Sequence, residues 1–165
     1  MRTARMTEEL VMQIAEVMTP GPIACAPDTT VAEAARLMWE GDCGVLPVVT
    51  DRTLYGVVTD RDLFIALATR DVRASELTVG SVARTNPYTC SPRDDVHQAM
   101  GKMKSHRVRR LPVVDADGTL VGIVSMNDLV LAIAPETRLG TQVVDTLQTI
   151  SEHQLPVPVA RATAV

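Results

Sequence analysis

Hydrophobic and polar residues along this chain follow two different periods, and both patterns occur twice. Apolar residues recur at the spacing i, i+3, i+4, i+7 of one helical face, at positions 31, 34, 35 and 38 and again at 96, 99, 100 and 103. Short β-branched runs follow each predicted helix, over Val45–Val49 and Leu54–Thr59 and over Leu111–Val114 and Leu120–Ser125. Such runs between turn residues are typical of buried strands.

Polar residues and prolines set the limits of these elements. Thr30 and Glu33 have the spacing of a capping box, and Asp95 and Gln98 take the same positions in the second pattern. Further helices are expected after the second strand of each pair, from Asp60 and Met126. Proline within the first strand of each pair predicts a sheet edge or a bulge, at Pro47 and Pro112. A last helical face is predicted near the C-terminus, at Leu139, Val143, Val144, Leu147 and Ile150.

The two patterns are copies of one another. A shift of 65 residues places Pro22–Pro27 on Pro87–Pro92 and Leu46–Val49 on Leu111–Val114, and one residue is gained before the second strands. The chain is therefore a tandem duplication. Each copy, two helices against a three-stranded sheet of about 60 residues, is marginal alone and is expected to pack against the other copy.

Composition and charge narrow the classes of function. The formal net charge of −4 and the aromatic content of 2% argue against a nucleic-acid-binding protein. No apolar run is long enough to span a membrane, and Met1–Thr7 does not resemble a signal peptide. The three cysteines have no disulfide-like spacing, which favours free thiols and a cytoplasmic location.

Catalytic machinery is not indicated. The sequence contains no metal-spaced cluster of His and Cys, no Walker-type glycine loop and no Ser/His/Asp arrangement. The three histidines, at 97, 106 and 153, share no ligand spacing. We therefore expect neither an enzyme nor a metal site, and no cofactor that the protein requires.

The end of the second strand of each pair carries a hydroxyl and, three residues later, a carboxylate. These pairs are Thr59 with Asp62 and Ser125 with Asp128. A carboxylate can accept hydrogen bonds from both hydroxyls of a ribose, and the N-terminus of the following helix favours a phosphate. The same spacing is also a capping box, which would close the helix without any ligand.

These motifs, Leu-Pro-Val-Val twice with Gly56–Asp62 and Gly122–Asp128, resemble those of the CBS-domain family, and the tandem pair resembles a Bateman module. The layout is similar to small stand-alone bacterial CBS proteins of the hypoxia-response type. The resemblance implies an α/β (α+β) fold of two β-α-β-β-α repeats about a pseudo-twofold axis, with flanking N- and C-terminal helices. It also implies a homodimer and a regulatory role in which two clefts bind adenosyl ligands such as AMP, ADP or ATP.

The resemblance assigns ligand contacts to matching positions in two clefts. The first cleft takes Ile23, Thr59, Arg61 and Asp62, and the second takes Tyr88, Arg109, Arg110, Ser125, Asn127 and Asp128. Arg109 and Arg110 precede a Leu-Pro pair, where relatives bind phosphates, whereas a solvated charge cluster is the alternative. Ile23 and Tyr88 belong to the first strand of each repeat, as a wall for adenine or as ordinary packing. The first copy has Arg61 where the second copy has Asn127, so the two clefts are expected to differ in affinity.

The expected domain limits are a helical extension at 1–13, repeats at 14–76 and 77–135, and a C-terminal helix and tail at 136–165. The expected partners are an adenosyl small molecule, a second copy of the chain and an effector protein of unknown identity, with no nucleic acid and no membrane. An alternative function is a structural or protein-interaction module whose clefts stay empty.

Overall fold

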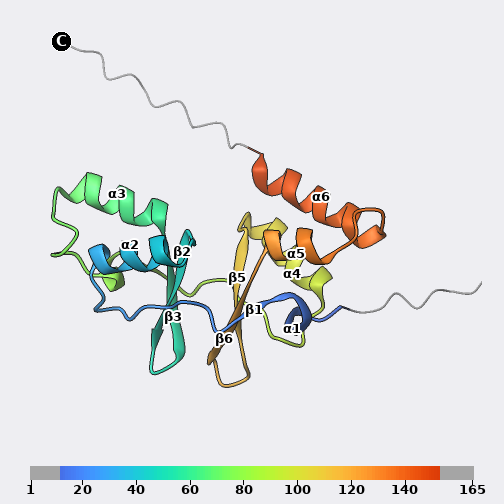
Figure 1. The fold of residues 1–165 in the computed structure, drawn as a ribbon, viewed down its shortest axis with the longest axis horizontal. Coiled ribbons are helices and arrows are strands. Elements are labelled where there is room, and N and C mark those ends of the chain that lie inside the picture. Colours follow the sequence, from blue (N-terminus) through green and yellow to red (C-terminus); the bar gives the residue numbers. More distant parts are fainter. Residues whose placement is uncertain (1–11, 153–165) are drawn as a thin grey trace, which may run out of the picture.

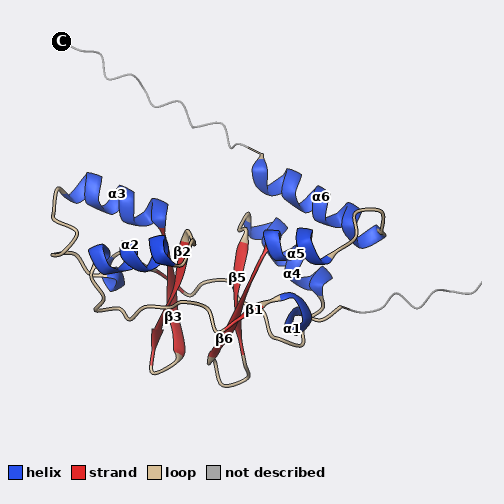
Figure 2. Cartoon of the chain, in the orientation of Figure 1, coloured by secondary structure: helices blue, strands red, loops and turns tan. Residues whose placement is uncertain are grey.

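Two sheets, each of three strands, and their covering helices form the part of the chain that the computed structural model describes, residues 12–152 (Figures 1 and 2). The elements, in chain order, are α1 (Ile14–Val17), β1 (Thr19–Pro20), α2 (Val31–Glu40), β2 (Val45–Thr50), β3 (Thr53–Thr59), α3 (Asp60–Arg70), η1 (Val79–Ser81, a 3-10 helix), β4 (Arg84–Thr85), α4 (Val96–His106), β5 (Arg110–Val114), β6 (Leu120–Ser125), α5 (Met126–Ala132) and α6 (Arg138–Ser151). The predicted α/β class with two copies of one unit is confirmed.

The two hairpins repeat each other in register. Thr59 lies opposite Val45 in the pair β2–β3, and Ser125 lies opposite Arg110 in the pair β5–β6. Each hairpin has an irregularity after its proline, and β2 and β5 are edge strands of their sheets. The outer side of β2 accepts one bridge, in which the Cys25 N–H donates to the Pro47 carbonyl at 3.0 Å. The edge position expected of these prolines is therefore confirmed.

Each sheet takes its third strand from the segment that precedes the other copy. Strand β1 pairs with β6, and β4 pairs with β3. The neighbouring backbone follows the same exchange, since the Ile14 N–H donates to Asp94 O at 3.0 Å and the Val79 N–H donates to Thr29 O at 2.8 Å. The two halves are thus linked by backbone pairing of short segments as well as by side-chain packing.

Two aliphatic cores result, one under each sheet. The first contains Cys25, Val31, Ala34, Met38, Leu46, Val48, Val58, Leu63, Ala66, Leu77 and Val79. The second contains Ile14, Cys90, Val96, Ala99, Met100, Met103, Leu111, Val113, Val124, Met126, Leu129, Ile133 and Val143. The tips of the two hairpins also meet, because the Leu54 N–H donates to Gly118 O and the Leu120 N–H donates to Arg52 O.

Two predictions about helix faces were wrong. Ala35 was expected on the buried face of α2 but is exposed, whereas its counterpart Met100 on α4 is buried. The difference follows from α6, which packs on α4 and adds side chains to the second core, whereas α2 packs mainly on α3 and β2. On α6 itself Leu139, Val143, Leu147 and Ile150 contact the core, but Val144 is 51% exposed.

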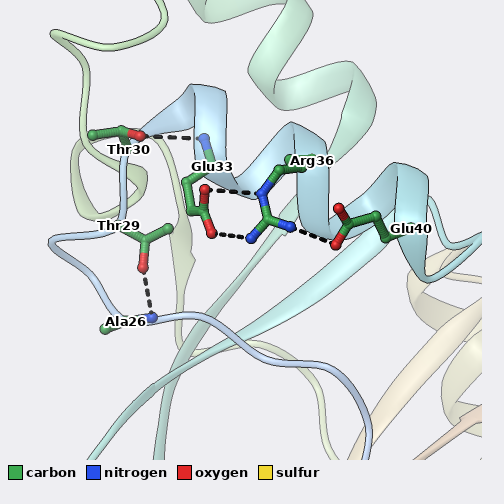
Figure 3. A network of polar contacts seen from close by, with 6 residues as sticks. All are labelled: Ala26, Thr29, Thr30, Glu33, Arg36 and Glu40. Carbon is green, nitrogen blue, oxygen red and sulfur yellow. Dashed lines mark hydrogen bonds and ion pairs between the residues drawn. The ribbon is translucent and has the colours of Figure 1, made fainter.

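The N-terminus of α2 has only half of its expected capping box. The Thr30 hydroxyl accepts a hydrogen bond from the Glu33 N–H at 3.2 Å, but the Glu33 carboxylate turns away to pair with Arg36 (Figure 3). Arg36 also binds Glu40 on the next turn, so the exposed side of α2 carries a ladder of ion pairs. Both halves of the box are present at the start of α4, between Asp95 and Gln98.

The ends of the chain bear on two of the expected domain limits. The helical extension expected at 1–13 lies outside the described residues, except for Met12 and Gln13, and Gln13 is the N-cap of α1. The expected C-terminal helix is α6, and the tail after Glu152 also lies outside the described residues. The boundary between the repeats at residues 76 and 77 stays a prediction, because each repeat contributes a short strand to the sheet of the other.

Candidate functional site

A cavity of about 710 Å³ lies between the two halves. Its wall combines the start of β2, the junction of β3 and α3, the segment after β4, the segment before β5 and the last turn of α6. The residues that line it are Gly44, Val45, Val57, Thr59, Asp60, Arg61, Arg84, Thr85, Asn86, Pro87, Tyr88, Arg107, Val108, Arg109, Arg110, Pro112, Ile123 and Ile150. The cavity is therefore composite, with apolar walls from both sheets and a basic rim.

Thr59 closes the N-terminus of α3 at one side of this cavity. Its hydroxyl accepts from the Asp62 N–H at 3.1 Å and donates to Asp62 Oδ2 at 2.6 Å, and its own N–H donates to the same oxygen at 3.1 Å. The other carboxylate oxygen, Oδ1, accepts from Arg84 at 2.8 Å. Asp62 is thus fully engaged and does not line the cavity, although Thr59 does.

The charge of Asp62 is favoured by these contacts. Burial on its own raises the pKa of Asp62, but the hydrogen bonds from Thr59 and from Arg84 together lower it below the ordinary value of an aspartate. Asp62 is therefore ionised at neutral pH and holds the Arg84 guanidinium at the edge of the cavity.

The second motif has the same local geometry but a different position. The Ser125 N–H and hydroxyl each donate to Asp128 Oδ2 at 2.7 Å, so the box of α5 copies that of α3. Neither residue is among those lining the cavity, and Asn127 is exposed at the start of α5, also outside the lining. The cap interpretation of both motifs is satisfied in the structure, and the ligand interpretation stays a prediction.

Tyr88 presents an aromatic wall to the cavity. Its ring stacks on the imidazole of His106, with centroids 3.6 Å apart and planes inclined by 7°. The matching residue Ile23 packs against Gly41, which takes the place of His106 in the first copy. Its Cδ1 lies 2.4 Å from the point where a Cβ on Gly41 would stand. Neither residue belongs to a strand, contrary to expectation, because β1 and β4 end before them.

Basic residues dominate the rim. Five arginines line the cavity: Arg61, Arg84, Arg107, Arg109 and Arg110. Arg84 is bound to Asp62, and Arg107 pairs with Glu152 at 3.4 Å. The side chains of Arg61, Arg109 and Arg110 have no ion pair or hydrogen bond with any residue in the range 12–152. In a chain of net charge −4, this is a local concentration of unneutralised positive charge.

The structure groups the predicted residues differently from the two clefts of the sequence analysis. Thr59 and Arg61, expected in one cleft, meet Tyr88, Arg109 and Arg110, expected in the other. The strand exchange contributes to this: β4, which precedes the second copy, pairs with β3 of the first copy, and the residues that follow β4 up to Tyr88 line the same cavity as Thr59. Ile23, Asp62, Ser125, Asn127 and Asp128 do not line this cavity.

Sequence reasoning missed three contributors to the site. Arg84 belongs to a two-residue strand, for which the sequence holds no period. Arg107 was noticed within the basic run but not selected, and Ile150 was interpreted only as packing. The sequence did hold one signal for this basic site: the second copy has arginines, Arg109 and Arg110, where the first copy has Gly44 and Val45.

The remaining polar chemistry is structural. Within the described part of the chain no three His, Cys, Asp or Glu side chains are grouped to hold a metal ion, and no helix there has the length and apolarity to cross a membrane. The three cysteines are free. Burial raises the pKa of Cys25 to about 11, and burial is also the main cause that raises that of Cys90 to about 12, so both thiols stay protonated at neutral pH.

Known proteins share this fold and much of this sequence. CBS domain-containing protein YhcV of Bacillus subtilis is 35% identical over 116 residues, which cover 70% of this chain and 81% of that protein. An inosine-5'-monophosphate dehydrogenase of Korarchaeum cryptofilum is 34% identical over 110 residues, but these span only 21% of the enzyme. The dehydrogenase activity therefore belongs to a protein of which this chain matches a minor part.

Solved structures agree. Hypoxic Response Protein I, described with two coordinated zinc ions, superposes with a TM-score of 0.69 at 29% identity, over 74% of this chain and 100% of that one. CBSX2 of Arabidopsis thaliana in complex with AMP gives a TM-score of 0.64 at 33% identity, over 73% and 94%. The family model described as the CBS domain matches residues 14–69 and 79–135. With both copies matched and the fold shared, this chain belongs to the CBS-domain family, as a tandem pair.

Proposed function

We propose that this protein is a regulatory module without catalytic activity, which binds an adenosyl ligand in the cavity between its halves. The observation that carries the proposal is the composition of that cavity. Thr59 and the N-terminus of α3 stand on one side, the Tyr88 ring on another, and three unpaired arginines on the rim. A nucleotide has parts that fit each of these surfaces.

Each part of such a ligand has a partner of suitable chemistry. The apolar side chains of Val57, Val108 and Ile123 and the Tyr88 ring offer a wall to a base. The guanidinium groups of Arg109 and Arg110 suit phosphate oxygens, since a planar fork can hold two of them. AMP is the ligand in the CBSX2 complex, which belongs to a protein of the same family.

Thermal unfolding with added adenylates tests the proposal. A ligand at 100 times its dissociation constant stabilises a native state by about 2.7 kcal/mol, which corresponds to a melting temperature higher by roughly 5–10 °C for a chain of this size. The double variant Arg109→Ala/Arg110→Ala should lose most of the shift with ATP. Arg73→Ala removes an exposed arginine away from the cavity and should keep it. Absence of any shift with millimolar adenylates in the unaltered protein would refute the proposal.

A purely structural module is the second candidate, and one observation favours it. Asp62 and Asp128 both accept hydrogen bonds within their own capping boxes, so each carboxylate has a role without ligand. This candidate predicts that no small molecule co-purifies with the protein. Mass spectrometry of the denatured protein's supernatant distinguishes the two, because bound adenylate would be released.

We further propose that the module acts in the cytoplasm as a homodimer that signals to an effector protein. Large apolar side chains are exposed on the helices of both halves, with Trp39 on α2 and Leu131 on α5 each 87% exposed and Phe64 on α3 71% exposed. The high exposure of such large apolar side chains on helices of both halves is what supports a protein contact. Ligand binding between the halves would change what the effector meets.

A further inference from the structure

The last turn of α6 takes part in the ligand cavity, although this helix lies outside the residues that match the family. The CBS-domain match ends at residue 135, and α6 begins at Arg138. Ile150 nevertheless lines the cavity, and Glu152, at the C-cap of α6, pairs with Arg107 of the cavity rim at 3.4 Å. An element added to the tandem pair thus reaches the site.

Each partner of this ion pair has one locally unfavourable feature, the backbone conformation of Arg107 and the charge of Glu152. Arg107 is the C-cap of α4 in the left-handed conformation, with φ of 51°, which favours Gly, Asn or Asp; the matching residue of the first half, Asp42, has φ of 46°. Glu152 puts a negative charge at the C-terminus of α6, whose dipole favours a positive one. The positive charge of Arg107 suits the C-terminus of α4, but helix stability explains neither its left-handed backbone nor the charge of Glu152, and such exceptions gather at functional sites.

The ion pair between Arg107 and Glu152 is also weak. Its side chains are 39% and 67% exposed, so solvent weakens the attraction between them. A phosphate at the rim offers the Arg107 guanidinium an acceptor of higher charge, next to the unpaired Arg109 and Arg110. Glu152 and an anionic ligand therefore compete for one cation.

We infer that Glu152 is an internal competitor of the ligand's phosphates, and that occupancy of the cavity releases the C-terminal turn of α6. This inference rests on the proposed function, because it concerns the same cavity. Glu152 sets the affinity for phosphate-bearing ligands alone, and α6 carries the signal of occupancy towards the C-terminus of the chain.

Affinity measurements on the full chain test the competition. Glu152→Gln keeps the shape and the backbone of the C-cap but removes the charge, and it should tighten ATP binding by about two- to five-fold in calorimetry, the range of one exposed ion pair. Adenosine, which has no phosphate, should bind equally to both proteins. Asp145→Asn is the matched control, since Asp145 on the same helix pairs with Lys104 at 2.6 Å but Lys104 does not line the cavity.

Hydrogen exchange provides a second measurement that a merely structural role of Glu152 would not affect. Saturating ATP should speed the exchange of amides 148–152, and saturating adenosine should not. Equal ATP affinities for Glu152→Gln and Asp145→Asn, or slower exchange at the end of α6 with ATP, would overturn the inference while leaving the proposed function intact. Failure of the unaltered protein to bind any adenylate would overturn both.

Discussion

Asp62 stabilises the fold in two ways, through the capping box of α3 and through its ion pair with Arg84. Replacing it separates these two contributions, because the second half supplies an internal control. Asp62 and Asp128 close matching capping boxes with Thr59 and Ser125, but of the two only Asp62 also binds an arginine among residues 12–152. Both aspartates are the N3 residues of their boxes, and loss of the reciprocal hydrogen bonds that they accept from the N-cap residue costs about 1 kcal/mol. The Arg84 pair adds between about 0 and 1 kcal/mol, since Arg84 is 72% exposed while Asp62 is 11% exposed.

Asp62→Ala should therefore lower the free energy of unfolding by about 1–2 kcal/mol and Asp128→Ala by about 1 kcal/mol, as measured by urea denaturation at neutral pH. The pKa of Asp62 is lowered in the folded protein, so its contribution exists above the pKa of the unfolded chain and is lost as the pH falls through the folded pKa. The gap between Asp62→Ala and the unaltered protein should accordingly shrink on acidification. A larger loss for Asp128→Ala, or a gap that widens in acid, would contradict the geometry described above.

Further predictions concern assembly, thiols and glycines. Light scattering at tens of micromolar should give the mass of a dimer, and Trp39→Glu with Phe64→Glu should give a monomer; a monomeric unaltered protein would refute the contact. Timed alkylation at pH 8 should modify Cys43 first, because Cys25 and Cys90 are buried with raised pKa values, and denaturation should expose all three thiols. Gly101→Ala, with nothing within 4 Å of the new Cβ, should stabilise α4 by about 0.5–1 kcal/mol. Gly56→Ala should destabilise, since its Cβ would lie 2.7 Å from the Arg84 carbonyl oxygen, and thermal melts of this pair of variants check both signs.

The duplicated pattern was enough to predict the hairpins and the main helices. Each of these elements is long enough for its hydrophobic pattern to be recognised even when its first and last residues are uncertain. Thr59 and Ser125 were correctly expected where a strand ends and a helix begins. The strand exchange was beyond reach, since Thr19–Pro20 and Arg84–Thr85 are too short to carry a period. That exchange decides which residues meet. Several site residues were therefore named correctly from the sequence, but they were assigned to two separate clefts instead of one cavity. The prediction for Ala35 was wrong for a related reason: its counterpart Met100 lies on α4, which α6 covers, and α6 is far away in the chain.

The exchange also explains how one cavity can respond to the arrangement of both halves. Its walls come from β3 and α3 on one side and from the segments before β5 and after β4 on the other, so a ligand there contacts elements of both copies. Divergence of the copies then affects this site directly: Arg109 and Arg110 stand where the first half has Gly44 and Val45, and all four line the same cavity. A ligand can shift the arrangement of the halves only through contacts that differ between arrangements. If a ligand binds as proposed, phosphates held by arginines of one half, next to a helix N-terminus of the other, would be contacts of that kind, whereas a site built wholly within one copy would hold its ligand equally well in either arrangement.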